Sequence, residues 1–397
     1  MRDPHLHSRH PGGASVRRGG AYAGTGVSRS VLLVLLALAL AACGEAPQSV
    51  LDPRGPFAEQ PDTLFRIVLL IALAVFLVVQ GLIVYAVVKY RDRGDDSPLP
   101  AQVHGNTRME LVWTIIPALI LAGIAVPTIQ TVFDLAETPD GAMEVEVIGH
   151  RWWWEYRYPG MGPDGGDLVT ANELVLPVDQ PVHLLMTAEE AGSAANAVIH
   201  SYWVPALAGK QDVVPGRITT INLQASQTGV FPGQCTEYCG LSHANMRNYA
   251  TVLSQEDFDA WVQAQNQPAP EPAEGSLAAR GKELVSQSFQ VEGLGDRACI
   301  SCHAINGEGA GVGPDLTHLM SREMFAGAIF DLYDSDGIWG NWDRSSPNVE
   351  DLTAWVRNAP EMKAMRATSE TGAVGMPNLG LSQDEAAAIV EYLLTLE

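Results

Sequence analysis

The sequence is poor in basic residues. Among its 397 residues, 24 Lys and Arg stand against 46 Asp and Glu, which gives a formal net charge of −22. A surface this acidic repels nucleic acid and attracts basic partners. The sequence also contains no Gly-rich phosphate loop and no hydrolytic triad. We therefore expect no nucleic-acid partner, and neither nucleotide binding nor hydrolysis is indicated.

Cysteines are also scarce, and the five that are present fall into three groups with none left over. Cys43 stands alone near the N-terminus, Cys235 and Cys239 form one pair, and Cys299 and Cys302 form another. Each group predicts different chemistry. Seven of the ten histidines have no metal-ligand spacing, and we expect them to be surface or packed residues: His5, His7, His10, His104, His150, His183 and His318.

Residues 1–42 predict a secretion signal. The apolar run Val31–Ala42 is too short to cross a bilayer as a stable helix, and it ends in small residues directly before Cys43. The sequence Leu-Ala-Ala-Cys resembles the bacterial lipobox, in which the cysteine is lipidated and becomes the mature N-terminus. We expect a lipoprotein signal peptide over 1–42 and a membrane lipid on Cys43; the alternative is an unprocessed membrane helix.

Two longer apolar stretches, Leu64–Val88 and Leu111–Phe133, are each long enough to span a membrane. They predict a transmembrane helical hairpin over residues 64–133, preceded by a periplasmic tether over 43–63. The loop between them is basic, so the positive-inside rule places it in the cytoplasm and everything after the second span outside. The basic residues of this loop are Lys89, Arg91, Arg93 and Arg108.

The rest of the chain predicts two water-facing domains. Residues 134–264 contain short alternating apolar segments punctuated by Gly and Pro, a pattern typical of an all-β sandwich or barrel. A linker rich in Pro, Ala and Glu follows over 265–275. Residues 276–397 have helical patterns and end in a helix with a capping box at Ser382 and Glu385, which predicts an all-α domain.

The pair Cys235-x3-Cys239 predicts a copper site. A mononuclear blue-copper site needs one Cys, a later His and a weak axial Met, but this loop offers two thiolates, and two bridging thiolates can hold two copper ions. His200 supplies a second imidazole, and the carbonyl of Glu237 lies between the cysteines. A disulfide or a Cys2His2 zinc site is the alternative, although zinc needs no Met and a disulfide needs no His. The expected ligands are His200, Cys235, Glu237, Cys239, His243 and Met246.

The segment Cys299-x-x-Cys302-His303 predicts covalent attachment of a c-type haem, with two thioether links and His303 as the proximal iron ligand. The expected distal ligand is Met376, in Val-Gly-Met-Pro before the final helix, which matches the cytochrome c pattern. Four other methionines compete with it, although core packing is their more ordinary role: Met320, Met324, Met362 and Met365. The sequence indicates no function for an acidic, Trp-bearing insertion over 331–348.

The segments around the predicted copper ligands carry a family resemblance. His200-Ser-Tyr-Trp-Val-Pro and Gly233-Gln-Cys-Thr-Glu-Tyr-Cys-Gly-Leu-Ser-His-Ala-Asn-Met resemble cytochrome c oxidase subunit II, and the resemblance covers residues 50–265. The haem motif further resembles the bacterial variety that has a fused cytochrome c domain. The resemblance implies a cupredoxin-like fold over 134–264, a cytochrome c domain over 276–397, and a dinuclear copper A centre that passes electrons to haem a in subunit I.

Two further residues are carried over from this resemblance. Gly149-His-Arg-Trp-Trp-Trp resembles the family's aromatic segment, which makes Trp152 the residue where electrons enter the copper domain; for Trp153 and Trp154, simple packing is an equal alternative. Glu110 matches the carboxylate at the mouth of a proton channel. Glu110 could also form a capping box with Thr107, and the two roles are compatible.

Together these features predict the electron-input subunit of a bacterial haem-copper terminal oxidase, a multi-pass protein of the inner membrane. A soluble or membrane-bound cytochrome c, or another basic donor, would supply electrons to haem c. Copper A would pass them to subunit I, which reduces oxygen to water with proton pumping; subunit III is a further expected partner. The alternatives are a nitric oxide reductase subunit, which Glu110 and Trp113 disfavour, a membrane-anchored electron shuttle, and a copper-assembly lipoprotein.

Overall fold

The computed structural model describes residues 33, 34, 37, 47–91, 102, 104–337, 339–365 and 375–397. The chain divides into two compact units, Met1–Ala46 and Pro47–Glu397, and the helical hairpin and both folded domains belong to the second. The predicted lipidation site Cys43 and the loop residue Arg93 lie outside the described residues.

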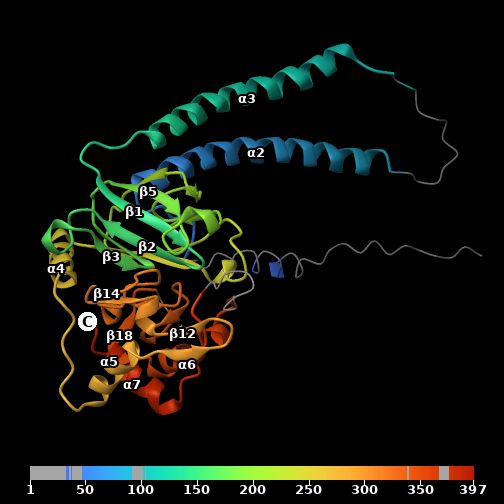
Figure 1. Cartoon of the computed structure of the whole chain (residues 1–397). Coiled ribbons are helices and arrows are strands. Elements are labelled where there is room, and N and C mark those ends of the chain that lie inside the picture. Colours follow the sequence, from blue (N-terminus) through green and yellow to red (C-terminus); the bar gives the residue numbers. More distant parts are fainter. Residues whose placement is uncertain are drawn as a thin grey trace, which may run out of the picture. The chain divides into compact units, whose positions relative to one another are not determined.

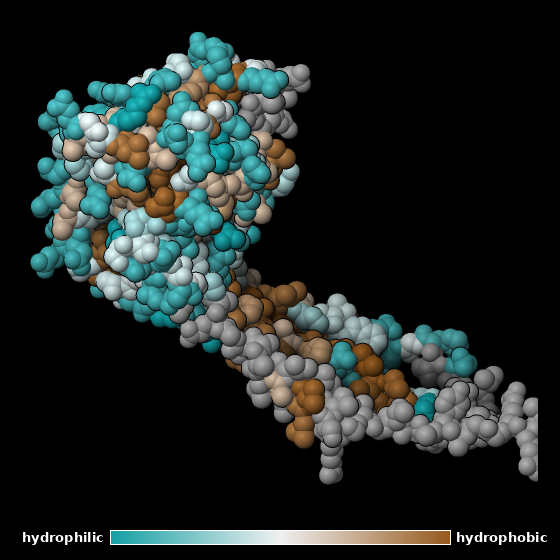
Figure 2. Space-filling view, turned by 90° about the horizontal axis from the view of Figure 1, so that it is seen from below, coloured by the Kyte–Doolittle hydropathy of each residue, from teal (hydrophilic) through white to brown (hydrophobic). Residues whose placement is uncertain are grey.

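Two long helices form the predicted hairpin. α2 spans Pro56–Lys89 and α3 spans Thr107–Ala136, and each is long and apolar enough to cross a membrane. They run side by side (Figure 1), and their apolar side chains are exposed. Figure 2 shows hydrophobic residues along this hairpin, whereas hydrophilic residues cover much of the globular part. Exposed apolar side chains on helices of this kind are buried by lipid or by other membrane helices.

The cap of α3 differs from the prediction. Asn106 caps this helix in place of Thr107, because its backbone is extended and its side chain accepts hydrogen bonds from the N–H groups of Arg108 and Met109. Asn is the stronger capping residue of the two. Glu110 still closes the reciprocal contact, since its Oε1 accepts the Asn106 N–H at 3.2 Å. The predicted box was therefore right about Glu110 and wrong about its partner.

Two β-sheets form the predicted sandwich. The larger sheet has the strand order β3-β2-β1-β5-β8, and the smaller has the order β4-β10-β9. Fully buried apolar side chains, among them Val145, Leu174 and Leu184, fill the space between the sheets. The strands are β1 (Met143–His150), β2 (Trp153–Tyr158), β3 (Leu168–Ala171), β4 (Glu173–Pro177), β5 (Val182–Ala188), β8 (Thr219–Leu223), β9 (Gly229–Gln234) and β10 (Arg247–Leu253).

A short strand pair and one helix complete this domain. The pair consists of β6 (His200–Trp203) and β7 (Lys210–Val213), and helix α4 (Gln255–Gln265) follows β10. The predicted linker comes next, and beyond Gln265, which still belongs to α4, it contains neither helix nor strand. It is nevertheless fixed to the C-terminal domain, because the backbone N–H of Ala269 donates to the side chain of Asn306 at 2.8 Å.

Three helices form the core of the C-terminal domain: α5 (Leu277–Ser286), α6 (Val349–Met362) and α7 (Gln383–Leu393). α5 and α7 approach closely at Gly281, where a Cβ atom would overlap the carbonyl oxygen of Ala388. Only glycine permits this contact.

The sequence prediction for this domain was right for its helices and incomplete for its loops. The capping box of α7 is confirmed, because Ser382 and Glu385 each accept the backbone N–H of the other. The loops between the helices carry four short strand pairs that the all-α prediction omitted: β11 (Phe289–Val291), β12 (Gly295–Arg297), β13 (Ala304–Ile305), β14 (Glu308–Gly309), β15 (Met324–Phe325), β16 (Phe330–Asp331), β17 (Tyr333–Ser335) and β18 (Trp342–Pro347).

The acidic insertion over 331–348 contains the hairpin β17–β18, and it contacts the β-sandwich. The indole rings of Trp339 and Trp342 lie 6.3 and 6.4 Å from the ring of Tyr249 on β10. The Tyr249 hydroxyl also accepts the backbone N–H of Glu323 at 3.1 Å. The insertion therefore joins the two domains, a role that the sequence did not indicate.

Candidate functional site

The predicted copper ligands come together between β6 and the loop that joins β9 to β10. His200 begins β6, and the other side chains belong to the loop. Cys235 Sγ lies 3.8 Å from Cys239 Sγ and 3.9 Å from His200 Nδ1. Cys239 Sγ lies 3.7 Å from His243 Nδ1 and 3.7 Å from Met246 Sδ.

These spacings match donors arranged around metal ions and not a disulfide. Two sulfur atoms that bind one ion at about 2.3 Å in a tetrahedral arrangement lie roughly 3.8 Å apart, whereas a disulfide brings them to about 2.05 Å. Both cysteines are free and buried. Within the described part of the chain, His200, Cys235 and Cys239 are the group of side chains that could hold a metal ion. The Glu237 carbonyl oxygen, 3.2 Å from Cys235 Sγ, is a further donor.

The two thiols do not ionise independently. A hydrogen bond from the Cys239 thiol, with a smaller contribution from His200, lowers the pKa of Cys235 to about 3. The same contact with Cys235, together with burial, raises the pKa of Cys239 far above its usual range. Each thiol therefore shifts the ionisation of the other, and bound cations would favour the thiolate form of both. This is the behaviour expected of residues that share copper ions.

The CxxCH segment lies on a largely apolar cavity whose walls include Cys299, Cys302 and His303. His303 Nδ1 lies 2.7 Å from the Pro314 carbonyl oxygen, which can only accept, so Nδ1 carries the proton and Nε2 is free to bind iron. Burial lowers the pKa of His303, which keeps its ring neutral. Gly313 permits a close approach, because a Cβ atom there would lie 3.3 Å from His303 Cε1. These residues fit a c-type haem.

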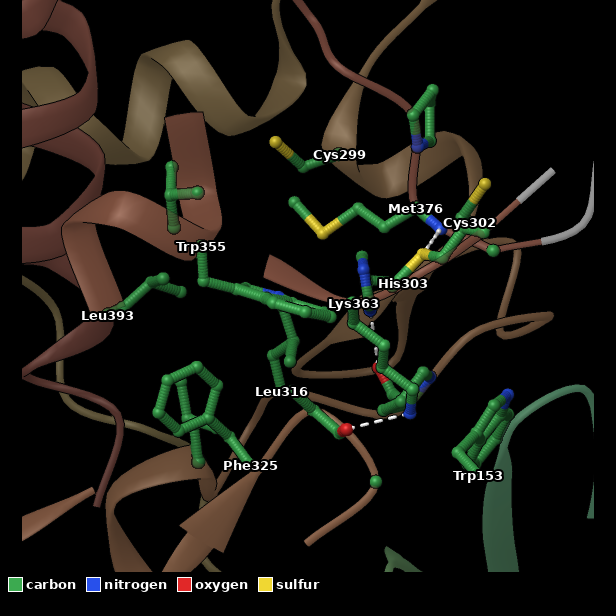
Figure 3. A pocket seen from close by; sticks show the side chains of 18 of the residues that line it. Trp153, Cys299, Cys302, His303, Leu316, Phe325, Trp355, Lys363, Met376 and Leu393 are labelled. Atoms are coloured by element: carbon green, nitrogen blue, oxygen red, sulfur yellow. Dashed lines mark hydrogen bonds between the residues drawn. The ribbon is translucent and has the colours of Figure 1, made fainter. Parts of the chain in front are cut away.

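Met376 extends into this cavity near Cys299 and Cys302 (Figure 3). Of the four competing methionines, Met324 and Met365 also line the cavity. Met365 Sδ accepts the backbone N–H of Met376 at 3.1 Å, so that sulfur already has a partner. Met376 is therefore the better placed distal ligand, and this assignment stays a prediction.

Sequence reasoning missed Arg322, a cation in the cavity wall. Arg322 is 4% exposed and lines the cavity, and its Nε has no hydrogen-bond partner among the residues that the structure describes. Its Nη2 donates to the Asp315 carbonyl oxygen at 2.6 Å. A buried guanidinium with a free N–H suits a carboxylate, and haem carries two propionate carboxylates. A single Arg outside any motif gave no signal of this fit.

Trp152 contacts both places. Its Nε1 donates to the carbonyl oxygen of Cys239 at 3.0 Å, and the residue also lines the cavity of the CxxCH segment. Trp153 lines the same cavity and stacks on His150 with 4.3 Å between ring centres. Trp154 is fully buried in the core of the sandwich. The three adjacent tryptophans therefore have three different surroundings.

Glu110 belongs to neither cluster. It is exposed on the first turn of α3, at the end of the hairpin where the basic loop begins. Its proton-uptake role stays a prediction, as does the lipidation of Cys43.

Comparison with known proteins assigns the chain to a family. Residues 47–131 match the family model of the cytochrome C oxidase subunit II transmembrane domain, residues 143–252 match that of its periplasmic domain, and residues 278–397 match that of cytochrome c. The chain is 33% identical over 378 residues to the cytochrome c oxidase subunit 2 of Alkalihalophilus pseudofirmus, which covers 93% of this chain and 97% of that protein. The chain belongs to the cytochrome c oxidase subunit II family.

The chain is also similar to another subunit 2 and to a solved periplasmic domain of subunit II. The cytochrome c oxidase subunit 2 of Bacillus subtilis is 29% identical over 388 residues, covering 92% of this chain and 97% of that protein. The solved periplasmic domain of subunit II of cytochrome oxidase (CoxB) of Bradyrhizobium japonicum is 28% identical and covers 32% of this chain and 96% of that chain, with a TM-score of 0.29. As a subunit II with a fused cytochrome c domain, the protein carries copper A and haem c, and it has an oxidase subunit I as its partner.

Proposed function

We propose that this subunit receives electrons from an external donor at haem c and passes them through copper A to subunit I, where oxygen is reduced to water with proton pumping. Cys299 and Cys302 hold the haem by thioether links, and His303 and Met376 bind its iron. The copper pair is held by His200, Cys235, Glu237, Cys239, His243 and Met246. When bound, the haem and the copper pair each supply a one-electron carrier.

The observation that carries this proposal is the double contact of Trp152. Electron transfer makes and breaks no bond, but its rate falls steeply with the distance through the protein. Trp152 lines the haem cavity and hydrogen-bonds the backbone of the copper ligand Cys239, so it bridges the interval between the two carriers. At 5% exposure it also excludes water from that interval.

The copper loop is held in place by backbone contacts. An electron carrier needs such a rigid ligand set, because its geometry should change little on reduction. The Cys235 N–H donates to the Met246 carbonyl at 2.9 Å, which closes the two ends of the loop on each other. The Thr236 N–H donates to the Ser201 carbonyl at 3.0 Å, which ties the loop to β6 beside His200. The loop is therefore held by its own ends and by β6, and Ser242 adds a contact to Ala364 of the cytochrome domain.

We further propose the placement of the subunit in the bacterial inner membrane as a multi-pass protein with both domains in the periplasm. Lys89, Arg91 and Arg108 support this orientation, since all three stand where the two spans meet the connecting loop. A lipid on Cys43 would add a second anchor, and Glu110 would collect protons at the cytoplasmic end of α3. Subunit III and a basic donor such as cytochrome c are the further partners in this proposal.

Flash-induced electron transfer from haem c to copper A in the purified complex tests the route. Trp152→Ala removes both the ring and the hydrogen bond to Cys239, and we expect it to slow this step on the order of tenfold or more while the haem and copper spectra stay intact. Trp153→Ala is the matched control, because Trp153 lines the cavity without bonding the copper loop. An unchanged rate in Trp152→Ala would remove Trp152 from the path.

A further inference from the structure

Lys363 is a buried cation between the two domains that the route above does not use. It directly follows α6 and is 3% exposed. Its Nζ donates hydrogen bonds to the carbonyl oxygen of Trp152 at 2.8 Å and to that of Ala326 at 2.7 Å. Figure 3 shows its side chain in the same cavity as His303 and Met376. One lysine of the cytochrome domain thus binds the backbone of the copper domain at the tryptophan.

A lysine is an expensive choice for this position. Removing an ammonium group from water costs several kcal/mol. Burial lowers the pKa of Lys363 to about 7. Charge-assisted hydrogen bonds to two carbonyl oxygens offset the cost. A methionine of similar length would fill the space without this cost, but it could not fix the direction and distance of the Trp152 carbonyl.

The surroundings of Lys363 lock it against both domains. Gly327 has a φ of +80°, and a Cβ atom on it would overlap the Lys363 ammonium and lie 2.7 Å from the Trp152 carbonyl oxygen. On the other side, the Ser242 hydroxyl of the copper loop donates to the carbonyl oxygen of Ala364. The contact is therefore closed by the Ser242 side chain of the copper loop and by a glycine that leaves no spare room.

Electrostatics alone would not bring the two domains together. Residues 134–265 carry a net charge of −12 and residues 274–397 carry −11, so the domains repel each other at long range. Hydrogen bonds from a buried ammonium to neutral carbonyl groups are short and shielded from solvent ions. They hold the interface in spite of the like charges.

We propose that Lys363 is a positioning residue for electron transfer, which fixes the cytochrome domain on the backbone of Trp152 and so sets the distance between haem c and copper A. This role rests on the proposed route through Trp152. With both groups bound, the step would transfer one electron from the haem to the copper pair, and no bond or proton would change place. Since docking leaves Trp152 only 5% exposed, an external protein donor cannot contact it and must deliver its electron to the cytochrome domain.

The test uses the full-length chain in its complex, with both cofactors loaded. Lys363→Met removes the donors and keeps the length of the side chain, and Ser242→Ala removes the second contact across the same interface. Lys282→Met is the matched control, because Lys282 lies on the surface of the same domain and pairs with Glu271. The readouts are the flash-induced rate from haem c to copper A, the rate of haem reduction by an external cytochrome c, and the haem-to-copper distance distribution from pulsed electron paramagnetic resonance.

We expect Lys363→Met to broaden the distance distribution and to slow the internal step at least about tenfold, with donor-to-haem transfer and both optical spectra unchanged. Ser242→Ala should broaden the distribution less, and Lys282→Met should leave all three readouts as they are. A narrow distribution with an unchanged rate in Lys363→Met would overturn the positioning role. Should Lys363→Met fail to fold, an unchanged distribution in Ser242→Ala would overturn it. An internal rate that is also insensitive to Trp152→Ala would identify the proposed route itself as the failure.

Discussion

The copper site and the haem cavity of this subunit are built in different ways. At the copper site the His and Met donor atoms already lie 3.7–3.9 Å from a cysteine sulfur, and the loop that carries most of them is hydrogen-bonded to β6. The haem cavity is an apolar space whose walls come from both domains, since Trp152 and Trp153 line it together with residues of the cytochrome domain.

This difference separates the two sites in what each depends on. The copper site needs one sandwich and its ions, because every predicted ligand lies between His200 and Met246. The haem cavity needs the docked pair of domains, which Lys363, Gly327 and the β17–β18 hairpin hold together. Changes in the first site should therefore stay local, whereas changes at the domain contact should act on the second.

The largest expected effect breaks the copper site alone. Cys239→Ser should abolish the mixed-valence signal of the copper pair, because one bridging thiolate cannot hold two ions in this geometry. Haem c should stay attached and reducible. Electron paramagnetic resonance checks this by the hyperfine coupling to two equivalent copper nuclei.

Cys302→Ser is the reciprocal control for that experiment. It should impair haem attachment and leave the copper signal unchanged, because the copper loop does not depend on the cavity. A single-copper pattern in the wild-type protein at full loading would falsify the dinuclear assignment.

The second effect concerns the distal ligand of haem c. Met376→Ala should lower the midpoint potential of haem c by on the order of 100 mV, since axial ligands set haem potentials over about 0.8 V and a thioether ligand raises them. Met365→Leu is the matched control, because Met365 lines the same cavity. Redox titration of the haem band distinguishes the two variants, and a shift confined to Met365→Leu would assign the ligand to Met365 instead.

The third effect concerns stability at the domain contact. Glu173 on β4 is buried, and burial raises its pKa from 4.5 to about 7, although the Thr251 hydroxyl donates to its Oε1 at 2.7 Å. A raised folded-state pKa favours the protonated form. The stability that protonated Glu173 contributes to the fold is therefore fully present below about pH 4.5 and is lost as pH rises through about 7.

Glu173→Gln should therefore match the wild type near pH 4 and be more stable at pH 8, by up to about 3 kcal/mol. Calorimetry of the purified full chain at both pH values measures the difference. If the difference in stability between wild type and variant stayed constant from pH 4 to 8, Glu173 would not titrate in this interval.

The smallest structural effect is expected at Glu110, which belongs to neither the copper site nor the haem cavity. Glu110→Gln keeps an acceptor for the Asn106 N–H, so it should change the stability of α3 by less than about 1 kcal/mol. Turnover of the complex should nevertheless slow if this carboxylate collects protons, while reduction of haem c and copper A by the donor stays normal. Steady-state oxygen consumption beside stopped-flow reduction tests this, and normal turnover would leave Glu110 with its capping contact alone.

Most of the copper ligands could be predicted from the sequence because they are close together in the chain. Cys235, Cys239, His243 and Met246 lie on one loop, so their spacing alone restricts their chemistry, and the structure brings His200 to them. The haem motif was readable for the same reason. Alternating apolar residues and the Ser382 capping box likewise predicted the sandwich and the final helix, since both signals are local.

Contacts between distant segments could not be read in this way. Lys363 meets Trp152 across 211 positions of sequence, and no local pattern distinguishes it from a surface lysine. Arg322 reaches the cavity wall, and the β17–β18 hairpin reaches Tyr249, only in the folded chain. The cap at Asn106 was missed for a smaller reason, because Asn106 and Thr107 are both capping residues and adjacent positions compete.

The shared wall of the haem cavity has a consequence for the order in which this subunit matures. Trp152 and Trp153 line the cavity from the copper domain, so the docked arrangement supplies part of the wall of the cavity that Cys299 and Cys302 also line. A rigid macrocycle has more room to reach both sulfurs before this part of the wall is in place. We expect haem attachment to come before the two domains meet, whereas the copper loop can be filled at any stage. Docking would then be the last step of biogenesis. In a chain without haem, Trp152 would dock against an empty cavity.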